Sequence, residues 1–339
     1  MNRKAVSLLL TSGLLLLAAC SQATTATPAA ATSNAQSPSA QSPDTLQPLS
    51  SVGMSGDLSF HDPSLLGNVG FSTGNENTTS NPQGIRVHTS SGGVGGFWST
   101  VGTIAVAAWA KNYNIKNVWA PDIVKNGSTY YLYYAASQFG TTNSGIGVTT
   151  STNPGNPGSW VDHGSAILTS NGKDYNAIDP NVFNDNGIYW MAFGSFFSGI
   201  KLVKMSSMTS VTGTVYTLAT RPGVQYNPLE APSIVKHNNY YYLFMAWDFC
   251  CRGTSSTYNT RVGRATSITG PYLDKSGKRL DQGGGTLLLG NSCNQIGPGG
   301  ADIVDGTSNL AYHYYDAGDG GRWKLGVKAL SWVSDWPVP

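Results

Sequence analysis

The sequence contains few charged residues and no segment with a sustained helical period. Aspartate, glutamate, lysine and arginine make up 11% of the 339 residues, compared with roughly a quarter in an average soluble protein. The formal net charge is +2, and no long basic run is present, so we expect no nucleic-acid partner. The lack of helical periodicity argues against a TIM barrel or a Rossmann layout. The glycine runs at 283–285 and 297–300 lack the lysine that a phosphate-binding loop needs, so we interpret them as turns.

Glycine and large aromatic residues are abundant instead. The chain has 41 glycines, 17 tyrosines and 9 tryptophans, a composition that indicates many tight turns between aromatic-rich strands. A chain of this length could hold two domains, but closed all-β folds often exceed about 200 residues as one domain. We therefore expect a single all-β domain over residues 56–339.

The N-terminal residues have the pattern of a secretory signal. Arg3 and Lys4 precede an apolar run that ends in Leu-Ala-Ala-Cys at 17–20, and this run is too short for a stable membrane span. The ending resembles the bacterial lipobox, which predicts cleavage after residue 19 and lipidation of Cys20. The alternative is an ordinary signal peptide with a chance cysteine.

Residues 20–55 are rich in serine, alanine, threonine, glutamine and proline. Such a segment buries too little apolar surface to order itself, so it is expected to be a disordered tether. The predicted location is extracytoplasmic, anchored to a bacterial membrane only through lipid, or else secreted.

Three cysteines remain after Cys20, namely Cys250, Cys251 and Cys293. An odd number cannot all pair within the chain. The neighbours Cys250 and Cys251 could bridge each other, or one of them could pair with Cys293. No metal-binding spacing is present, so these cysteines are interpreted as structural.

One sequence unit recurs along most of the chain. Its clearest copy runs from Leu229-Glu230-Ala231-Pro232 through a polar turn at 237–239 into the aromatic strand 240–245. Aligned on the proline position, the copies fall roughly 50 to 70 residues apart, which is the scale of propeller blades. The other copies begin at His61-Asp62-Pro63, Trp119-Ala120-Pro121, Ile178-Asp179-Pro180 and, more loosely, Gly300-Ala301-Asp302. Five copies predict a five-bladed β-propeller.

The propeller geometry would bring three acidic residues together. Asp62 and Asp179 directly precede the repeat proline, and Glu230 stands one residue earlier. Because the innermost strands of all blades line one channel, equivalent positions converge at one end of it. Hydrolysis of a glycosidic bond uses a protonated carboxyl group and a carboxylate, and a third carboxylate can raise the pKa of the acid. The pattern therefore indicates a glycosidase.

The repeat motifs resemble those of glycoside hydrolase family 43, five-bladed propeller enzymes that act on arabinose- and xylose-containing polysaccharides. Further stretches, including 194–200, 248–253 and 312–316, resemble the endo-α-1,5-L-arabinanases within it. The resemblance covers about residues 57–336 and implies an inverting mechanism. It implies that Asp62 is the general base, Glu230 the general acid, and Asp179 the residue that tunes the pKa and orientation of the acid.

The resemblance also implies a metal site and a set of substrate contacts. His313 would lie near the channel axis and help to hold a metal ion, usually calcium, largely through water. From the residue type alone, a single histidine among tyrosines would be assigned to the core, because calcium prefers oxygen ligands. Trp119 could stack on a sugar or pack between blades. The other residues expected to line the substrate subsites are Asn176, Ala177, Ile178, Ser195 and Phe196.

These observations predict a monomeric hydrolase that cleaves internal α-1,5 bonds of plant cell-wall arabinan. Two alternatives remain open at this point. One is an exo-acting arabinanase or an arabinofuranosidase or β-xylosidase of the same family. The other is a carbohydrate-binding propeller without catalysis.

Overall fold

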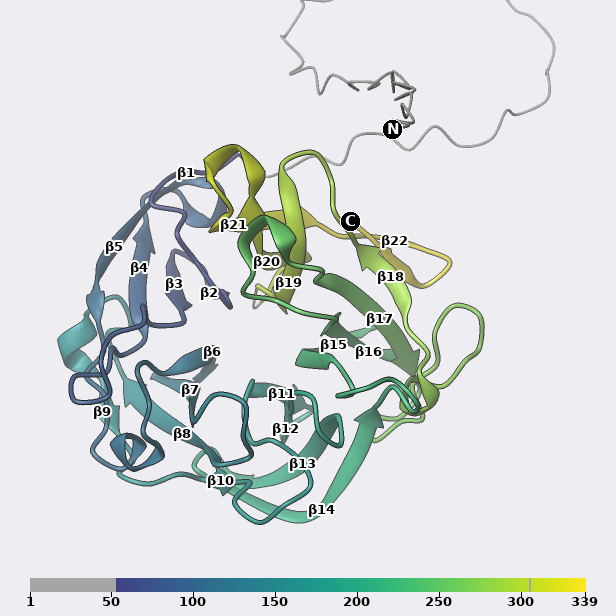
Figure 1. The fold of residues 1–339 in the computed structure, drawn as a ribbon, viewed down its shortest axis with the longest axis horizontal. Helices are drawn as coiled ribbons and strands as arrows, with labels where there is room; N and C mark the ends of the chain where they lie inside the picture. Colours follow the sequence, from purple (N-terminus) through teal and green to yellow (C-terminus); the bar gives the residue numbers. More distant parts are fainter. Residues whose placement is uncertain (1–52, 305) are drawn as a thin grey trace, which may run out of the picture. The chain divides into compact units, whose positions relative to one another are not determined.

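The computed structural model describes residues 53–304 and 306–339. These residues form five sheets of three to five strands, arranged in a ring with one strand of each sheet at the centre (Figure 1). The predicted five-bladed all-β propeller is therefore confirmed. The expected signal peptide, Cys20 and the tether up to residue 52 lie outside the described residues. Within the described part of the chain, the search for an apolar helix long enough to cross a membrane finds none.

The blades run in sequence order from the inside of the ring outwards, except that β1, the first strand in sequence, pairs with β5 at the outer edge of blade 1, and that β9 and β10 both pair with β8 in blade 2. Blade 1 holds β2 (Ser64–Leu66), β3 (Val69–Ser72), β4 (Arg86–Ser90), β5 (Phe97–Thr103) and β1 (Ser55–Gly56). Blade 2 holds β6 (Trp119–Asn126), β7 (Thr129–Ser137), β8 (Ser144–Ser151), β9 (Val161–Asp162) and β10 (Leu168–Thr169). Blade 3 holds β11 (Asn181–Asp185), β12 (Ile188–Phe193), β13 (Ile200–Ser207) and β14 (Ser210–Ala219).

The remaining blades complete the ring. Blade 4 holds β15 (Leu229–His237), β16 (Tyr240–Trp247), β17 (Asn259–Ala265) and β18 (Thr286–Leu289), and blade 5 holds β19 (Gln295–Ile303), β20 (Asn309–Asp316) and β21 (Arg322–Ala329). A hairpin of β22 (Ser331–Val333) and β23 (Trp336–Val338) follows. The helical segments of the described residues are six short 3₁₀ turns: η1 (Gly93–Gly95), η2 (Ala110–Tyr113), η3 (Pro157–Ser159), η4 (Gly253–Ser255), η5 (Leu280–Gln282) and η6 (Ala317–Asp319).

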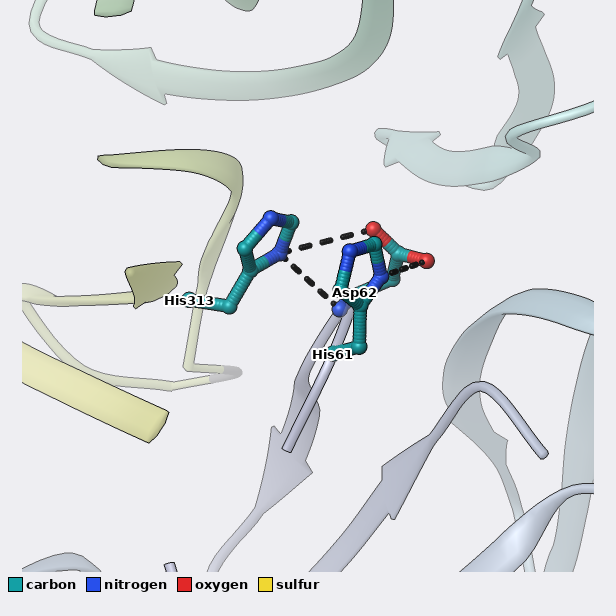
Figure 2. A group of neighbouring side chains, drawn as sticks. All are labelled: His61, Asp62 and His313. Carbon is teal, nitrogen blue, oxygen red and sulfur yellow. Dashed lines mark hydrogen bonds and ion pairs between the residues drawn. The ribbon is translucent and has the colours of Figure 1, made fainter. Parts of the chain in front are cut away.

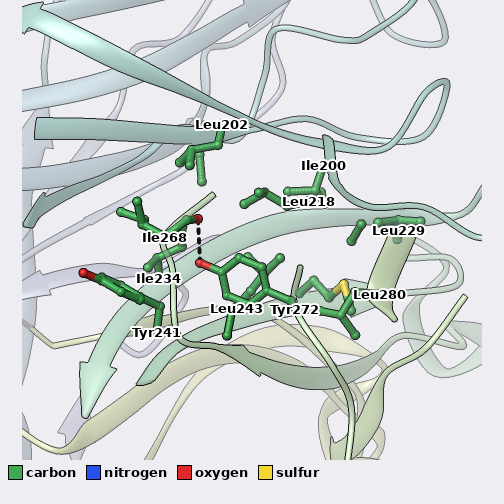
Figure 3. Packing of buried hydrophobic residues seen from close by; sticks show 14 of the residues in the cluster. Ile200, Leu202, Leu218, Leu229, Ile234, Tyr241, Leu243, Ile268, Tyr272 and Leu280 are labelled. Atoms are coloured by element: carbon green, nitrogen blue, oxygen red, sulfur yellow. Dashed lines mark hydrogen bonds between the residues drawn. The ribbon is translucent and has the colours of Figure 1, made fainter. Parts of the chain in front are cut away.

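One apolar cluster fills the space between each pair of neighbouring blades. The cluster between blades 3 and 4 contains Leu243, which is fully buried (Figure 3). Its neighbours Tyr242 and Phe244 point the other way, into the cluster between blades 4 and 5. Because side chains alternate along a strand, a strand packed on both faces must be apolar at nearly every position. This explains the continuous aromatic run that marked the repeat in the sequence.

The ring closes where blade 1 meets blade 5. Phe60, Leu65 and Trp98 of the first repeat pack against Leu325 and Val327 of β21. The N–H of Leu325 also donates a hydrogen bond to the carbonyl oxygen of Leu58 over 2.8 Å. The residues just before β2 are therefore held between two blades, and the next residues in sequence are His61 and Asp62.

The residue before the repeat proline adopts the same backbone conformation in all five copies. Asp62, Ala120, Asp179, Ala231 and Gly300 all have φ between 45° and 56°. Non-glycine residues rarely adopt this left-handed region. In β6, β15 and β19 the strand pairing shifts at this point. The five residues with this conformation all line the channel cavity. Two of them are the acids Asp62 and Asp179, whereas in the fourth copy the acid Glu230 directly precedes the left-handed residue Ala231.

Candidate active site

Two residues after each left-handed residue, a buried ring of polar side chains crosses the channel. Asn181 Nδ2 donates to Asp122 Oδ1 over 3.1 Å and to Asp302 Oδ1 over 3.3 Å. The hydroxyl groups of Ser64 and Ser233 donate to Asp302 over 3.0 and 2.9 Å. Asp122 Oδ2 also accepts the N–H of Val182 over 2.8 Å. These hydrogen bonds join the five blades across the channel. Asp122 therefore has a structural role in the ring.

The three predicted acids lie together at one end of this channel. Asp62 and Asp179 line its cavity, and Glu230 directly precedes Ala231, whose N–H donates to Asp179 Oδ2 over 3.1 Å. Residues that are more than 160 positions apart in the sequence, as Asp62 and Glu230 are, therefore share one site.

Asp62 accepts hydrogen bonds from two neighbouring side chains. Thr73 Oγ1 donates to Asp62 Oδ2 over 2.6 Å, and His61 Nδ1 lies 2.8 Å from the same oxygen. Burial alone would raise the pKa of Asp62. The charge and hydrogen bond of His61, with smaller effects of His313 and Thr73, outweigh burial and hold this pKa well below its usual range. Asp62 is thus kept as a carboxylate, the state that a general base requires.

Glu230 has the opposite electrostatic environment. Burial raises the pKa of Glu230 to about 7, and the charge of Asp62 acts in the same direction, whereas a hydrogen bond from Ser195 and the charge of His61 lower it. Ser195 Oγ donates to Glu230 Oε2 over 2.5 Å, and the hydroxyl of Tyr258 donates to Glu230 Oε1. The side chain is therefore held in one orientation and keeps a proton near neutral pH, as a general acid must.

Asp179 lies between these two groups. Burial, the charge of Glu230 and the charge of Asp62 all raise the pKa of Asp179 well above its usual value, against the hydrogen bond from the N–H of Ala231. Because Asp179 and Glu230 repel each other when both are charged, the pair retains a proton near neutral pH. The role of Asp179 as the residue that tunes the acid stays a prediction.

His313 is fully buried and stacks on His61 beside Asp62, as Figure 2 shows. Its Nδ1 accepts the N–H of Asp62 over 3.1 Å, whereas its Nε2 is buried without a hydrogen-bond partner among the described residues. Burial, reinforced by His61, lowers the pKa of His313 to about 3, so the ring is neutral. His61, Asp62 and His313 offer ligand atoms that all lie within 4.8 Å of one another. A buried polar atom that still needs a partner fits the expected ion with its bound water.

The residues expected to contact substrate have differing surroundings. Two of them form hydrogen bonds within the protein. The Ser195 hydroxyl donates to Glu230, and Asn176 Oδ1 accepts a hydrogen bond from the hydroxyl of Ser144 over 2.6 Å. Ala177 has no exposed surface and packs between blades 2 and 3, and Ile178 is buried next to it. Any effect of Ala177 on substrate binding must therefore pass through its neighbours.

Aromatic side chains at the surface are available for a sugar. Phe196 is partly buried and packs near Phe249, with ring centroids 5.8 Å apart. The Trp119 indole donates to Asn117 Oδ1 over 2.9 Å and lies beside Phe139. Phe139 is 83% exposed, and sequence reasoning missed it because one phenylalanine in a polar loop carries no motif. Large exposed aromatic rings of this kind are common in sugar-binding clefts as well as at protein interfaces.

Cys250 and Cys251 form a disulfide with each other, the first of the two pairings left open by the sequence. They lie in the loop between β16 and β17, and Cys251 Sγ is 3.9 Å from His61 Nε2. The bridge therefore borders the catalytic end of the channel.

A propeller with one charged carboxylate and a carboxyl pair that retains a proton has the groups that glycoside hydrolases use. Comparison with known proteins identifies the family. The model of glycosyl hydrolases family 43 matches residues 61–337. The chain belongs to this family and is a glycoside hydrolase.

Individual relatives are similar over most of their length. The chain is 43% identical over 295 residues to the extracellular endo-alpha-(1->5)-L-arabinanase 1 of Bacillus subtilis, with 84% of this chain and 88% of the relative covered. It is 37% identical over 278 residues to an extracellular exo-alpha-(1->5)-L-arabinofuranosidase of Cellvibrio japonicus, with 75% and 80% covered. The structure of the GH43 endo-arabinanase from Bacillus licheniformis superposes with a TM-score of 0.77 at 39% identity, covering 85% of this chain and 99% of that one.

Proposed function

We propose that the protein is an endo-α-1,5-L-arabinanase that hydrolyses internal bonds of arabinan with inversion at the anomeric carbon. The observation that carries the proposal is the convergence of Asp62, Asp179 and Glu230 at one end of the channel, where their surroundings lower the pKa of Asp62 and raise the pKa of Glu230. The names of the relatives in Bacillus support the substrate and the endo mode.

The reaction follows from these charge states. The Asp62 carboxylate takes a proton from a water molecule, and the water oxygen attacks the anomeric carbon. Glu230 gives its proton to the leaving oxygen on the other side of the sugar, so the bond breaks without a free alkoxide. Asp179 shares the retained proton with Glu230 and accepts the N–H of Ala231, the residue that follows Glu230. At the end Asp62 is protonated and Glu230 is charged, and solvent returns both to the starting state.

Product sizes test the endo mode against the exo alternative, which the Cellvibrio relative keeps open. We expect linear arabinan to yield a spread of oligosaccharides at early times, with a rapid loss of viscosity. Release of arabinose alone, or of one fixed short product, would favour exo action. Debranched arabinan and xylan assayed side by side separate an arabinanase from a xylosidase.

The two pKa shifts predict the pH dependence. Glu230 must be protonated to act, and its proton is lost as the pH rises, so kcat/KM should fall about tenfold per pH unit above about 7. Asp62 stays charged well into the acid range, so activity should persist there.

The variant Ser195→Ala tests the assignment of this alkaline limb to Glu230. In the wild type the hydrogen bond from Ser195 stabilises the charged form of Glu230 and lowers its pKa, so removing this bond should move the limb to higher pH. Ser206→Ala, at an exposed position, is the control, and an unmoved limb in Ser195→Ala would contradict the assignment.

We also propose a calcium ion next to His313, held largely through water. A bound calcium ion would supply positive charge and ordered water beside the substrate. The buried Nε2 of His313, which has no partner among the described residues, supports this site. We expect bound calcium by elemental analysis of the purified wild type and its loss in His313→Ala, with His237→Ala, at the end of β15 where it stacks on Trp332, as the control. Equal calcium in both variants would remove His313 from the site.

The remaining proposals concern the state of the enzyme in its host. The site takes all three acids from one chain, which supports a monomer, and sedimentation velocity tests this oligomeric state.

The sequence at 17–20 supports a lipid anchor on Cys20, and two relatives are named extracellular. In Cys20→Ser the enzyme should move from the membrane fraction to the medium, and an unchanged distribution would exclude the anchor.

A further inference from the structure

A chain of hydrogen bonds joins the Cys250–Cys251 bridge to Asp62. The N–H of Cys251 donates to the hydroxyl oxygen of Tyr315 over 2.7 Å. That hydroxyl lies 3.1 Å from His61 Nε2, and His61 Nδ1 lies 2.8 Å from Asp62 Oδ2. The members come from a loop of blade 4, from β20 of blade 5 and from the entry to blade 1.

His61 connects Tyr315 to Asp62 through its two ring nitrogens. The Asp62 carboxylate can only accept a hydrogen bond, so His61 Nδ1 donates its hydrogen to Asp62 Oδ2. The Tyr315 hydroxyl lies against the other ring nitrogen, Nε2, while its oxygen accepts the N–H of Cys251. Because both nitrogens have a partner, the imidazole plane is held. Tyr315 therefore keeps the ring in the orientation that presents the Nδ1 hydrogen to the carboxylate.

The bridge determines where the N–H of Cys251 points. Cys251 has φ of 65°, in the left-handed region that non-glycine residues rarely adopt. A covalent link between neighbouring side chains closes a small ring that includes the peptide between them, so this peptide cannot rotate freely. Cys251 Sγ also lies 3.9 Å from His61 Nε2. Cys251 is exposed, so the bridge is accessible to small reductants.

We propose that Tyr315 and the Cys250–Cys251 bridge are positioning residues for the general base, acting through the orientation of the His61 ring. The inference rests on the proposed role of Asp62. It assigns the bridge a function in turnover in addition to any effect on stability, and it makes the activity of this enzyme sensitive to thiols.

Steady-state kinetics on linear arabinan test the positioning role. Tyr315→Phe and the double variant Cys250→Ser/Cys251→Ser should each lower kcat about tenfold, the loss of one hydrogen bond to a positioned group. KM should stay within a factor of about two, because neither change touches substrate. Combining all three substitutions should lower kcat no further, since the residues act as one unit. Tyr314→Phe, in the same strand but packed between blades 4 and 5, is the matched control and should keep wild-type kcat.

Reduction of the wild-type enzyme tests the bridge without any substitution. Dithiothreitol transfers two electrons and two protons to the bridge, giving the thiols of Cys250 and Cys251, while the dithiol becomes a cyclic disulfide. We expect the same tenfold loss of kcat, recovered on reoxidation. The serine double variant should not respond to reductant, whereas Cys293→Ser should respond as the wild type does.

Nitrogen NMR of the histidine rings provides a readout that a purely structural bridge would not move. The His61 Nδ1 resonance should be that of a hydrogen-bonded N–H in the wild type, and it should shift in Tyr315→Phe and in the reduced enzyme as the ring loses its orientation. Wild-type kcat and an unchanged Nδ1 resonance in Tyr315→Phe and in the reduced enzyme, with Asp62→Asn inactive, would overturn the positioning role and leave the proposed function intact. An active Asp62→Asn enzyme would instead remove the general base itself.

Discussion

Asp62→Asn is expected to lower kcat on linear arabinan by at least about a thousandfold, within the range measured for the loss of a general base. The asparagine amide has the size of the carboxylate and can still accept hydrogen bonds from Thr73 and His61. It cannot take a proton from water. Substrate affinity, measured by calorimetry with an arabino-oligosaccharide, should therefore change by no more than about threefold, because the loss falls on the transition state.

A matched control separates the chemistry of Asp62 from a general effect of removing a negative charge. Asp281 is an aspartate of η5 that pairs with Arg279 at the surface of the propeller. Asp281→Asn should retain wild-type kcat. Turnover near that of the wild type in Asp62→Asn would remove Asp62 from its role, and a matching loss in Asp281→Asn would show that the effect is not local.

Glu230→Gln is expected to lose activity in a way that depends on the leaving group. On arabinan the leaving group is a sugar hydroxyl, which needs a proton, so kcat should fall about a thousandfold or more. On a nitrophenyl arabino-oligosaccharide the leaving group departs as a stable anion, so the loss should be less than about tenfold. The glutamine oxygen can accept from one of the Ser195 and Tyr258 hydroxyl groups, and its NH2 group can donate to the oxygen of the other, so the side chain stays in place.

The comparison of the two substrates tests whether Glu230 is the proton donor, and the wild-type assay tests whether the propeller is catalytic. Equal losses on both substrates would mean that Glu230 does not donate the proton. Glu76→Gln, at an exposed glutamate of the first repeat, should behave as the wild type on both. A purified wild type without turnover on any arabinan would favour the carbohydrate-binding alternative.

The repeat predicted the fold because one physical pattern occurs five times. Each blade needs an inner strand that begins near the repeat proline, followed by an aromatic strand that is packed on both faces. Counting these pairs along the sequence gave the number of blades. The first repeat lacks the pair of tyrosines found in the second and fourth, yet β3 (Val69–Ser72) forms because Val69 and Phe71 fill the cluster between blades 1 and 2. The same logic placed Asp62, Asp179 and Glu230 together.

The supporting hydroxyl groups could not be predicted in the same way. Thr73, Tyr258 and Tyr315 are of residue types that are common in strands, and their partners are set by packing between blades. Tyr315 and His61 are 254 positions apart, so no local pattern signals the contact. The burial of Ala177 was equally hidden, because the resemblance placed its segment near substrate without saying which side chains face the channel.

The arrangement of the two carboxyl groups determines the stereochemistry of the product. An Asp62 that activates water opposite a Glu230 that protonates the leaving oxygen must invert the anomeric carbon. Proton NMR of the reducing end formed in the first moments of arabinan hydrolysis measures this directly. The account predicts that the β-anomer appears first and then equilibrates, whereas initial release of the α-anomer would contradict the assignment of Asp62 as a general base.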